Sequence, residues 1–565
     1  MKKRIFVMFF TMRIFLNILS VCFLAVLSLQ AQELHPPKYE YRAVWLTTVE
    51  NLDWPRTQVK CSLDIAQQQK ELVEIFDSLQ MMNVNTVLLQ TRVRGDVIYP
   101  SAIEPFSHVL TGVTGKDPGY DPLAFAIEEC HKRGMQLHAW LVTMPLGKDD
   151  HIRRQGAFAL SRRHRNLCTH YKGQWYMEPG NPDVDSYMAG IVREIVTNYD
   201  VDGIHFDYIR YPDRTAGYPD GALHRRHGRS ISLFSWRRGN ITRMVTVLYK
   251  TVKELKPWVR VSCAPLGKYD DLSRYSSLGW DAYNAVYQEA QNWLRDGVMD
   301  ILFPMLYFDG NNFYPFVLDW QENSAGRHIV PGIGVYRLLP EYGGWPLVEI
   351  ERQLWTSRSA GCAGTAMFRA DHLLGCGKEV YSGVYSGSAL VPPMDWAGDV
   401  PVSPSLISVQ RDMDGFSLQW QGVDANDGFP AMRYNVYASF GDTVDVGEIC
   451  NLVASSVDST YFRWECRTLN DVTFAVTATD AYGNESAPVV AKTKANPVLQ
   501  FGGSIVLPGF SGMGVRIEIL DIYGRRIYDG RYGKKLLVNG LSQGQYMLKV
   551  YDCHGALLYS DHFAK

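Results

Sequence analysis

The segment that decides the fold is VDGIHFDYIRYP, residues 201–212. Its apolar start and its polar, aromatic end are typical of a short buried strand that finishes in functional groups. Alternate side chains of a strand share a face, so His205 and Asp207 point the same way. An imidazole beside a carboxylate has no packing role inside a strand. The segment therefore predicts a buried strand whose carboxyl end carries a site.

Seven more short apolar segments, separated by amphipathic helices, accompany this strand between residues 38 and 390. They are residues 43–48, 84–90, 135–142, 258–264, 299–306, 328–334 and 363–368. Asp121-Pro122 and Asn181-Pro182 each supply a helix cap followed by a proline in the first turn. Eight strands alternating with helices predict a parallel sheet closed as a (β/α)₈, or TIM, barrel. An open, doubly wound sheet is the alternative, but no glycine-rich phosphate loop follows any of these strands.

The chain changes character after residue 390. Residues 391–404 are rich in proline and predict a linker. Residues 405–495 alternate as strands without helices and predict a β-sandwich, whose last part resembles the final hairpin of fibronectin type III modules. Residues 497–565 predict a second small all-β sandwich. Two of its stretches resemble the C-terminal sorting domains of the Bacteroidetes type IX secretion route, and a purely structural terminal domain is the alternative.

The first 31 residues have the pattern of a signal peptide. Three basic residues precede an apolar run from Ile14 to Leu29, and Ala31 is a suitable cleavage point. A membrane anchor is the alternative. We expect export to the periplasm, the cell surface or the medium, with no membrane span after cleavage. Cleavage would remove four basic residues and no acid, moving the formal net charge from −2 to −6. The remaining basic residues are scattered, so no nucleic-acid partner is expected.

The carboxyl ends of the predicted strands are rich in aromatic and charged side chains, and function in such barrels lies at these ends. Aromatic rings cover the apolar faces of sugars, while carboxylates and guanidinium groups bind hydroxyls. The pattern predicts a polysaccharide partner. The expected substrate-binding residues are Trp45, Trp54, Arg92, Arg94, Tyr99, His138, Trp140, His205, Tyr208 and Tyr307. Trp54 and Tyr99 fit a role as core aromatics equally well.

Glycoside hydrolysis usually needs two carboxyl groups, one ionised and one protonated. Asp207 is the first choice, and nearby Arg210 is expected to lower its pKa and keep it ionised as nucleophile or base. Capping or ion pairing is the alternative role for Asp207. His205 either binds a substrate hydroxyl or orients Asp207. The second carboxyl is less determined.

Asp96 is the preferred second carboxyl because it directly follows the strand that carries Arg92 and Arg94. The other candidates are Glu104, Glu289 and Asp309. A metal site built from Asp96, Asp207, His138 and His205 is a further alternative, but neither an HxH pair nor an HExxH motif occurs. We therefore expect no metal and no cofactor.

Many stretches of the first 380 residues resemble, in order, the glycosyl hydrolase-like ten family. They are Tyr41–Val49, Asn51–Pro55, Arg92–Ser101, Leu110–Gly112, Gly119–Leu123, His131–Gly134, Leu137–Trp140 and Asp202–Asp207. The family consists of exported bacterial proteins and is similar to α-amylase-type barrels, whose fourth-strand aspartate is the nucleophile. The resemblance thus gives Asp207 the main role. One characterised relative acts on peptidoglycan strands stripped of their peptides, which implies a cell-wall substrate.

The sequence departs from this family at two places. Tyr208 follows Asp207 where relatives usually have a second aspartate, and Val142–Pro145 replaces an Asn-Pro-Tyr-Arg motif. The sequence predicts an exported glycoside hydrolase that acts on a bacterial cell-wall or other polysaccharide. The alternatives are a non-catalytic glycan-binding protein and a surface scaffold, because an enzyme fold does not imply activity.

Overall fold

The computed structural model describes most of the chain. The described residues are 36–213, 215–275, 279–376, 383–411, 414–466, 468, 470–493, 499–501, 504–507, 515–533, 535–552, 555 and 557–565. The predicted signal peptide, residues 1–31, lies outside them. Within this described part, no helix combines the length and the apolar character that crossing a membrane requires.

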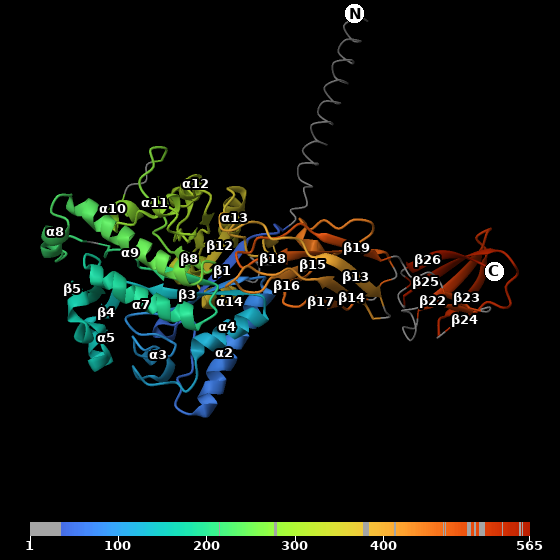
Figure 1. Cartoon of the computed structure of the whole chain (residues 1–565), viewed down its shortest axis with the longest axis horizontal. Coiled ribbons are helices and arrows are strands. Elements are labelled where there is room, and N and C mark those ends of the chain that lie inside the picture. The colour runs from blue at the N-terminus through green and yellow to red at the C-terminus, as the bar shows by residue number, and fades with distance from the viewer. Residues whose placement is uncertain are drawn as a thin grey trace, which may run out of the picture. The chain divides into compact units, whose positions relative to one another are not determined.

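A parallel β-barrel forms the first and largest part of the described chain (Figure 1). Its strands are β1 (Tyr41–Leu46), β2 (Thr86–Arg92), β3 (Gln136–Val142), β7 (Gly203–Asp207), β8 (Arg260–Cys263), β9 (Ile301–Leu302), β10 (His328–Ile329), β11 (Gly332–Ile333) and β12 (Gly364–Phe368). Their order around the sheet is β10-β9-β8-β7-β3-β2-β1-β12-β11. Each strand overlaps one of the eight predicted segments, so the predicted barrel is confirmed.

One predicted strand closes the barrel by pairing on both of its sides. Residues 328–334 split at Pro331 into β10 and β11; β10 pairs with β9, and β11 pairs with β12. The amide of Ala363 also donates to the carbonyl of Ile329 (2.9 Å). Hydrogen bonding therefore runs around the whole sheet, which distinguishes it from the open sheet considered as the alternative.

Helices separate successive strands and cover the outside of the barrel (Figure 1). They are α2 (Ser62–Met81), α4 (Pro122–Lys132), α7 (Pro182–Asn198), α9 (Leu233–Leu255), α10 (Ala282–Ala285), α11 (Ala290–Arg295), α12 (Tyr314–Glu322), α13 (Leu347–Ser359) and α14 (Ala370–Cys376). The predicted caps are present: Asp121 accepts from the amides of Leu123 and Ala124, and Asn181 accepts from that of Asp183. These side chains satisfy amides that a helix start leaves without partners.

The inside of the barrel is filled by its own apolar cluster, separate from the layer between helices and strands. Trp45, Trp140 and Phe303 are its large rings, packed with small residues such as Ala264 and Ala366. Rings of this size fill the barrel interior. Reactive groups must therefore lie at the carboxyl ends of the strands, where the interior packing stops.

An insertion between β3 and α7, which the sequence analysis did not predict, adds a small sheet beside the barrel. Its strands are β4 (Pro145–Lys148), β5 (Cys168–Tyr171) and β6 (Gln174–Met177), in the order β4-β6-β5. It also holds α5 (Asp149–Gln155) and α6 (Leu160–Arg163). The short helices α3 (His108–Thr111) and α8 (Gly221–His227) lie in the loops after β2 and β7.

Two all-β sandwiches follow, as predicted. In the first, β13 (Ser405–Arg411), β14 (Phe416–Gln421) and β17 (Tyr461–Trp464) form one sheet, and β16 (Leu452–Val457), β15 (Arg433–Phe440), β18 (Val472–Thr479) and β19 (Val489–Thr493) form the other. In the second, β20 (Leu499–Phe501), β21 (Ser504–Val506) and β24 (Leu536–Leu537) face β23 (Arg526–Arg531), β22 (Arg516–Asp521), β25 (Gln545–Tyr551) and β26 (Leu557–Ala564). Residues 391–404 contain neither helix nor strand.

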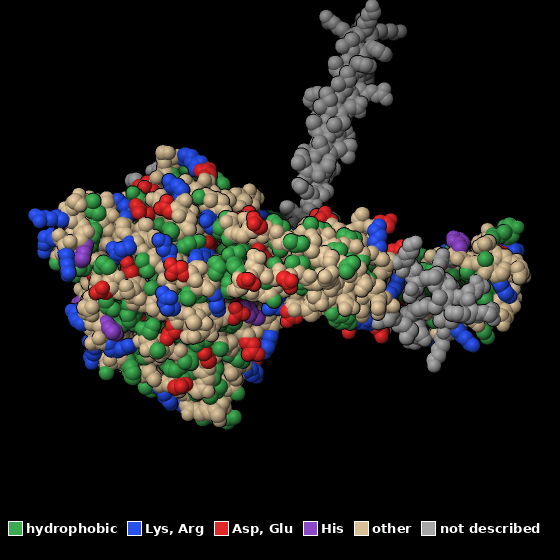
Figure 2. Space-filling model, viewed as in Figure 1, with side chains coloured by type: hydrophobic (Ala, Val, Ile, Leu, Met, Phe, Trp, Pro, Cys, Tyr) green, Lys and Arg blue, Asp and Glu red, His purple; other side chains and the backbone are tan. Residues whose placement is uncertain are grey.

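Charged side chains of both signs are interspersed over the barrel surface that Figure 2 draws. This mixed surface agrees with the small net charge of −2 for the whole chain.

Candidate active site

Asp207 is the last residue of β7 and lies at the carboxyl end of the barrel, as the sequence predicted. Its side chain is buried, with 6% exposed. The indole Nε1 of Trp140, on neighbouring β3, donates to Oδ2 (3.2 Å), and the amide of Tyr208 donates to Oδ1 (2.7 Å). Thr143 holds the two strand ends together, because its amide and hydroxyl both donate to the Asp207 carbonyl. Each carboxylate oxygen therefore has one fixed donor.

Burial raises the pKa of Asp207 from 3.8 to about 6, against the opposing effects of the Arg210 guanidinium and of the Tyr208 and Trp140 donors. Arg210 does act in the expected direction, but the expected net lowering is wrong because desolvation is the larger effect. A carboxyl group with a pKa near 6 is mainly ionised at pH 7 and still exchanges protons readily near neutrality.

His205 lies two residues earlier on β7, inside the barrel, with none of its surface exposed. The Trp45 indole donates to Nε2 (3.2 Å), so that nitrogen carries no proton. Nδ1–H therefore donates to the hydroxyl of Ser262 (3.0 Å). Burial lowers the pKa of His205 to about 3, which keeps the ring neutral. Both nitrogens are thus used within the protein, and Trp140 rather than His205 contacts the Asp207 carboxylate.

Aromatic rings surround the mouth of the barrel on the side of β9, β11 and β12. The ring centroid of Tyr307 lies 5.1 Å from that of Phe368, 6.0 Å from that of Tyr336 and 6.4 Å from that of Trp45. The carboxylate of Asp207 is close enough to affect the titration of Tyr307, whose pKa is raised first by burial and then by this charge. Tyr307 therefore stands at the edge of the Asp207 site, as the sequence predicted for a mouth residue.

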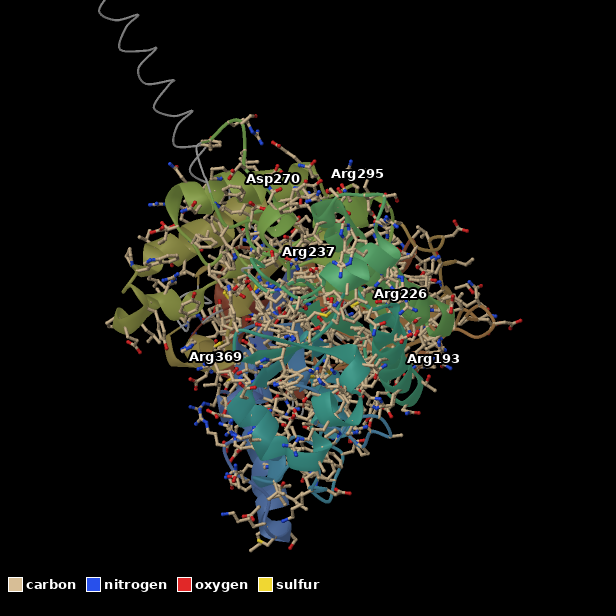
Figure 3. All side chains as sticks on the ribbon, turned by 90° about the vertical axis from the view of Figure 1, so that its left-hand side faces the viewer. Arg193, Arg226, Arg237, Asp270, Arg295 and Arg369 are labelled. Carbon is tan, nitrogen blue, oxygen red and sulfur yellow. The ribbon has the colours of Figure 1, made fainter. Side chains whose placement is uncertain are left out.

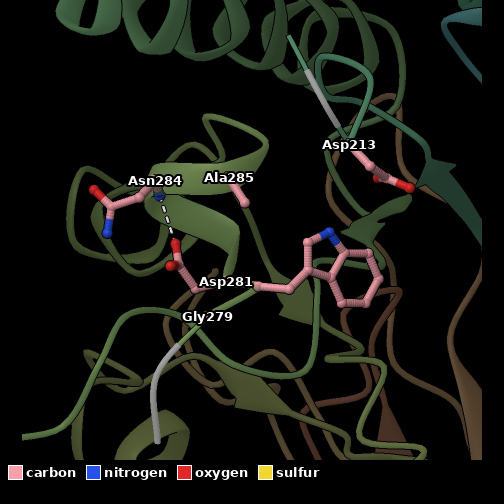
Figure 4. A pocket seen from close by; sticks show the side chains of 6 residues that line it. Asp213, Gly279, Asp281, Asn284 and Ala285 are labelled. Carbon is pink, nitrogen blue, oxygen red and sulfur yellow. Dashed lines mark hydrogen bonds between the residues drawn. The ribbon is translucent and has the colours of Figure 1, made fainter. Parts of the chain in front are cut away.

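The loop after β7 brings a second aromatic group to the site. Tyr208 is 42% exposed and has a left-handed backbone, φ +51°, which is uncommon for a bulky side chain and often marks a functional position. The Arg210 guanidinium lies 4.7 Å from the Tyr208 ring centroid and 5.9 Å from that of Trp280. Arg210 Nη1 also donates to Asp213 (2.8 Å). A cavity of about 600 Å³ opens beside this group, lined by Asp213, Gly279, Trp280, Asp281, Asn284 and Ala285 (Figure 4).

A buried ion pair holds this loop against the outer helices. Arg237 of α9, labelled in Figure 3, donates from Nε and Nη2 to both oxygens of Asp220 (2.7 and 2.9 Å). Its Nη1 donates to the hydroxyl of Tyr287 (2.9 Å). Bidentate pairing of this kind fixes orientation as well as distance. The loop after β7 is therefore fixed to α9 at Asp220.

Asp96 follows β2 in a buried position, with 1% exposed. Gln155 of α5 donates to its Oδ2 (3.1 Å), and His151 Nε2 lies 4.0 Å from the same oxygen. Burial raises the pKa of Asp96, opposed by the charge of His108 and by hydrogen bonds from Gln155 and Ser107. The described contacts of Asp96 are with the insertion and the loop before α3, rather than with Asp207.

Several other predicted substrate-binding residues do not line the mouth. Arg92 is fully buried and forms a two-bond ion pair with Glu104 (2.8 and 2.7 Å). The hydroxyl of Tyr99 donates to Glu194 on α7 (2.9 Å), so this ring belongs to the layer between helices and strands. Trp54 lies in the same layer and donates to the Gln68 carbonyl (2.9 Å).

His138 and Arg94 complete the predicted set. His138 is fully buried on β3, and its Nε2 lies 3.3 Å from Gln136 Oε1. Arg94 is partly exposed and pairs with Glu50 (2.6 Å). Among the ten expected binding residues, Tyr208 and Tyr307 have partly exposed rings at the Asp207 site. Trp45, Trp140 and His205 are buried inside the barrel next to this site.

Asp213, Trp280 and Asn284 were not among the residues predicted from sequence. Asp213 and Trp280 lie in loops and Asn284 in the four-residue helix α10, which are too short or irregular for a pattern to distinguish a binding side chain from any other surface residue. Among the described residues, no three His, Cys, Asp or Glu side chains come together in a way that could hold a metal ion.

The chain is similar to known carbohydrate-active proteins over the barrel. The family described as glycosyl hydrolase-like 10 matches residues 40–336. Glycosyl hydrolase YngK of Bacillus subtilis (strain 168) is 33% identical over 419 residues, which cover 68% of this chain and 80% of the relative. Glycosyl hydrolase DigH of Escherichia coli (strain K12) is 30% identical over 368 residues, covering 59% and 83%.

Solved structures with a similar course of the chain include the PgaB (BpsB) glycoside hydrolase domain from Bordetella bronchiseptica. It has 14% sequence identity and a TM-score of 0.44, and the match covers 63% of this chain and 100% of that domain. The family matches more than half of the chain, and two relatives are at least 30% identical over about four fifths of their length. The chain belongs to the glycosyl hydrolase-like 10 family.

Proposed function

We propose that this protein is a glycoside hydrolase that cleaves a polysaccharide, and that its substrate is a bacterial cell-wall glycan strand. The observation that carries the proposal is the state of Asp207. It is a buried strand-end carboxylate with a pKa of about 6, fixed by Trp140 and by the Tyr208 amide, with aromatic rings around it. Membership of a glycosyl hydrolase-like family supports this reading.

The geometry suits a nucleophile or general base. The indole N–H and the Tyr208 N–H each occupy one oxygen of Asp207, so the carboxylate cannot rotate and presents a fixed lone pair to the substrate. Such fixed orientation is a main source of catalysis by positioned groups. Tyr208 and Tyr307 are the rings that would cover the faces of the sugar units on either side of the scissile bond.

Asp96 is our candidate for the second carboxyl. Burial raises its pKa, which is the direction that a group acting as general acid requires. The observation that favours the second candidate function, a non-catalytic glycan-binding protein, concerns the same residue. Asp96 is 1% exposed and already hydrogen-bonded to Gln155.

The remaining parts of the chain support an exported, modular protein. We propose that residues 1–31 are a signal peptide and that the first sandwich is a fibronectin type III-like module, in agreement with its three- and four-stranded sheets. We further propose that residues 497–565 act as a sorting domain for secretion. A scaffold role for these modules would remain compatible with an inactive barrel.

The decisive experiment is incubation with peptidoglycan strands freed of their peptides and, in parallel, with a panel of neutral and acidic polysaccharides. Reducing ends and product masses are measured for the wild type, for Asp207→Asn and for Asp96→Asn. We expect new reducing ends from the wild type, and a loss of several orders of magnitude in Asp207→Asn. Equal product formation by the wild type and Asp207→Asn would refute the assignment of Asp207. Binding without product from every protein would favour the glycan-binding role.

A further inference from the structure

The cavity beside Arg210 has the size and lining of a binding site. Its volume of about 600 Å³ lies within the range of roughly 300–1,000 Å³ that is usual for small-molecule sites. In Figure 4, Asp213 stands on one side of the cavity, with Asp281 and Asn284 on the other. Asp281 is not free to move, because its carboxylate accepts from the Asn284 amide at the start of α10.

Arg210 connects this cavity to the candidate catalytic carboxylate. It lies three residues beyond Asp207, is 5% exposed, and its charge acts on the Asp207 carboxylate. The same guanidinium faces the ring of Trp280 and donates to Asp213, both of which line the cavity. Its Nε is buried and has no hydrogen-bond partner within the described part of the chain.

The lining offers the two kinds of contact that a sugar needs. Trp280 is 45% exposed, although a ring of its size is usually largely buried, so a flat apolar face is open to the cavity. The Asp213 side chain is 55% exposed, so its carboxylate can bind hydroxyl groups of a ligand in the cavity. Stacking on an aromatic face combined with a few polar groups is the usual composition of such sites.

The charges at the cavity restrict which sugar fits. Asp213 and Asp281 contribute carboxylates to the lining, and none of the described lining residues is a cation. Arg210, which contacts Trp280 and Asp213, is already paired with Asp213. A sugar that carries its own carboxylate would meet the like charges of Asp213 and Asp281 at short range. The lining therefore favours an uncharged sugar unit.

We propose that this cavity is a subsite that binds an uncharged sugar unit of the glycan, with Trp280 as its stacking platform. The inference rests on the proposed function, since it extends the same site along the polymer. In a cell-wall strand, where N-acetylglucosamine alternates with a sugar that carries a carboxylate, the N-acetylglucosamine unit would occupy the subsite.

The test measures binding in the Asp207→Asn background, so that hydrolysis does not interfere. Calorimetric titrations use the N-acetylglucosamine tetramer as the neutral probe and tetragalacturonate as the acidic probe. Added substitutions are Trp280→Ala, Trp280→Phe and, as a control of similar exposure on β17, Tyr461→Ala. Thermal unfolding verifies that each variant is folded.

We expect Trp280→Ala to weaken binding of the neutral tetramer about tenfold, the loss that corresponds to one aromatic stacking contact. Trp280→Phe should weaken it by less than about threefold, because a ring face remains. Tyr461→Ala should bind like the parent, and tetragalacturonate should bind more weakly than the neutral tetramer. The proposal is overturned if Trp280→Ala binds like the parent, if the neutral tetramer does not bind, or if the acidic tetramer binds more tightly.

The outcome is separable from that of the proposed function. If the wild type releases products while Trp280→Ala binds and turns over substrate like the wild type, the proposed hydrolase function is kept and the proposed subsite is refuted. If binding depends on Trp280 but no protein forms products, the proposed subsite is kept and the protein binds glycans without hydrolysing them.

Discussion

Replacing Asp207 with Asn should abolish hydrolysis and also change how stability depends on pH. Burial raises the carboxyl pKa from 3.8 to about 6, so between these values the folded protein holds a proton that the unfolded chain releases. The stability from this group is complete below pH 4 and is lost as the pH rises through about 6. The Asn variant cannot ionise and does not lose it.

The size of the effect follows from the shift. A difference of two pKa units corresponds to roughly 3 kcal/mol when the whole titration is crossed, and about 2 kcal/mol of this falls between pH 4.5 and 7.5. The free energy of unfolding, measured with urea and tryptophan fluorescence on the full chain, should therefore rise in Asp207→Asn relative to the wild type by about 2 kcal/mol over this interval. Other ionisable groups are common to both proteins and cancel in the difference.

Two results would refute this reasoning. If the free energy of unfolding depended on pH in the same way in both proteins, the Asp207 carboxylate would not be desolvated. A relative gain at low pH instead of high pH would mean that Arg210 and the two N–H donors outweigh burial, which would restore the lowered pKa expected from sequence. In the first case, the acid limb of the wild-type activity near pH 6 should also be absent.

Three further substitutions test the other contacts of the site. Trp140→Phe keeps a ring but removes the donor to Asp207, so the acid limb of kcat should move up by about one pH unit, and activity should recover above pH 8. Arg92→Met leaves Glu104 buried without its partner and should lower stability by about 3–5 kcal/mol, whereas Arg92→Met with Glu104→Leu should regain most of it; an unstable double variant would contradict this. His205→Asn should lower the unfolding free energy by about 1–3 kcal/mol and leave the pH profile of kcat/KM unmoved, and a shifted profile would instead make His205 a titrating group of the site.

The barrel could be predicted from sequence because each of its strands is a short apolar run bounded by a helix. The directions in which the side chains around the site point were harder to predict. Arg92 was expected to bind substrate at the mouth, but the register between β2 and β3 shifts between Gln90 and Arg92. A shift of this kind breaks the alternation of faces, and Arg92 points to Glu104 instead of the mouth.

The sequence of the insertion after β3 contains a hairpin signal that could have predicted its small sheet. Lys172 and Gly173 join β5 to β6 with φ +50° and +74°, which is the backbone of a two-residue hairpin turn. Lys-Gly is less typical of this turn than Asn-Gly, and the strands on either side are only four residues long. The placement of Tyr99 had no comparable signal. Its ring would suit a sugar, but its hydroxyl is held by Glu194 from the helix layer.

The pairing of β1 with β12 affects folding while the chain is being synthesised. Tyr41 pairs with Gly364, so the first strand has no neighbour on one side until roughly 320 more residues have been synthesised. At about 5–20 residues per second this takes on the order of 15–60 seconds, during which an apolar strand edge is open to other chains. A chaperone that covers residues 41–46 during this delay would protect the nascent protein more than one that acts after release.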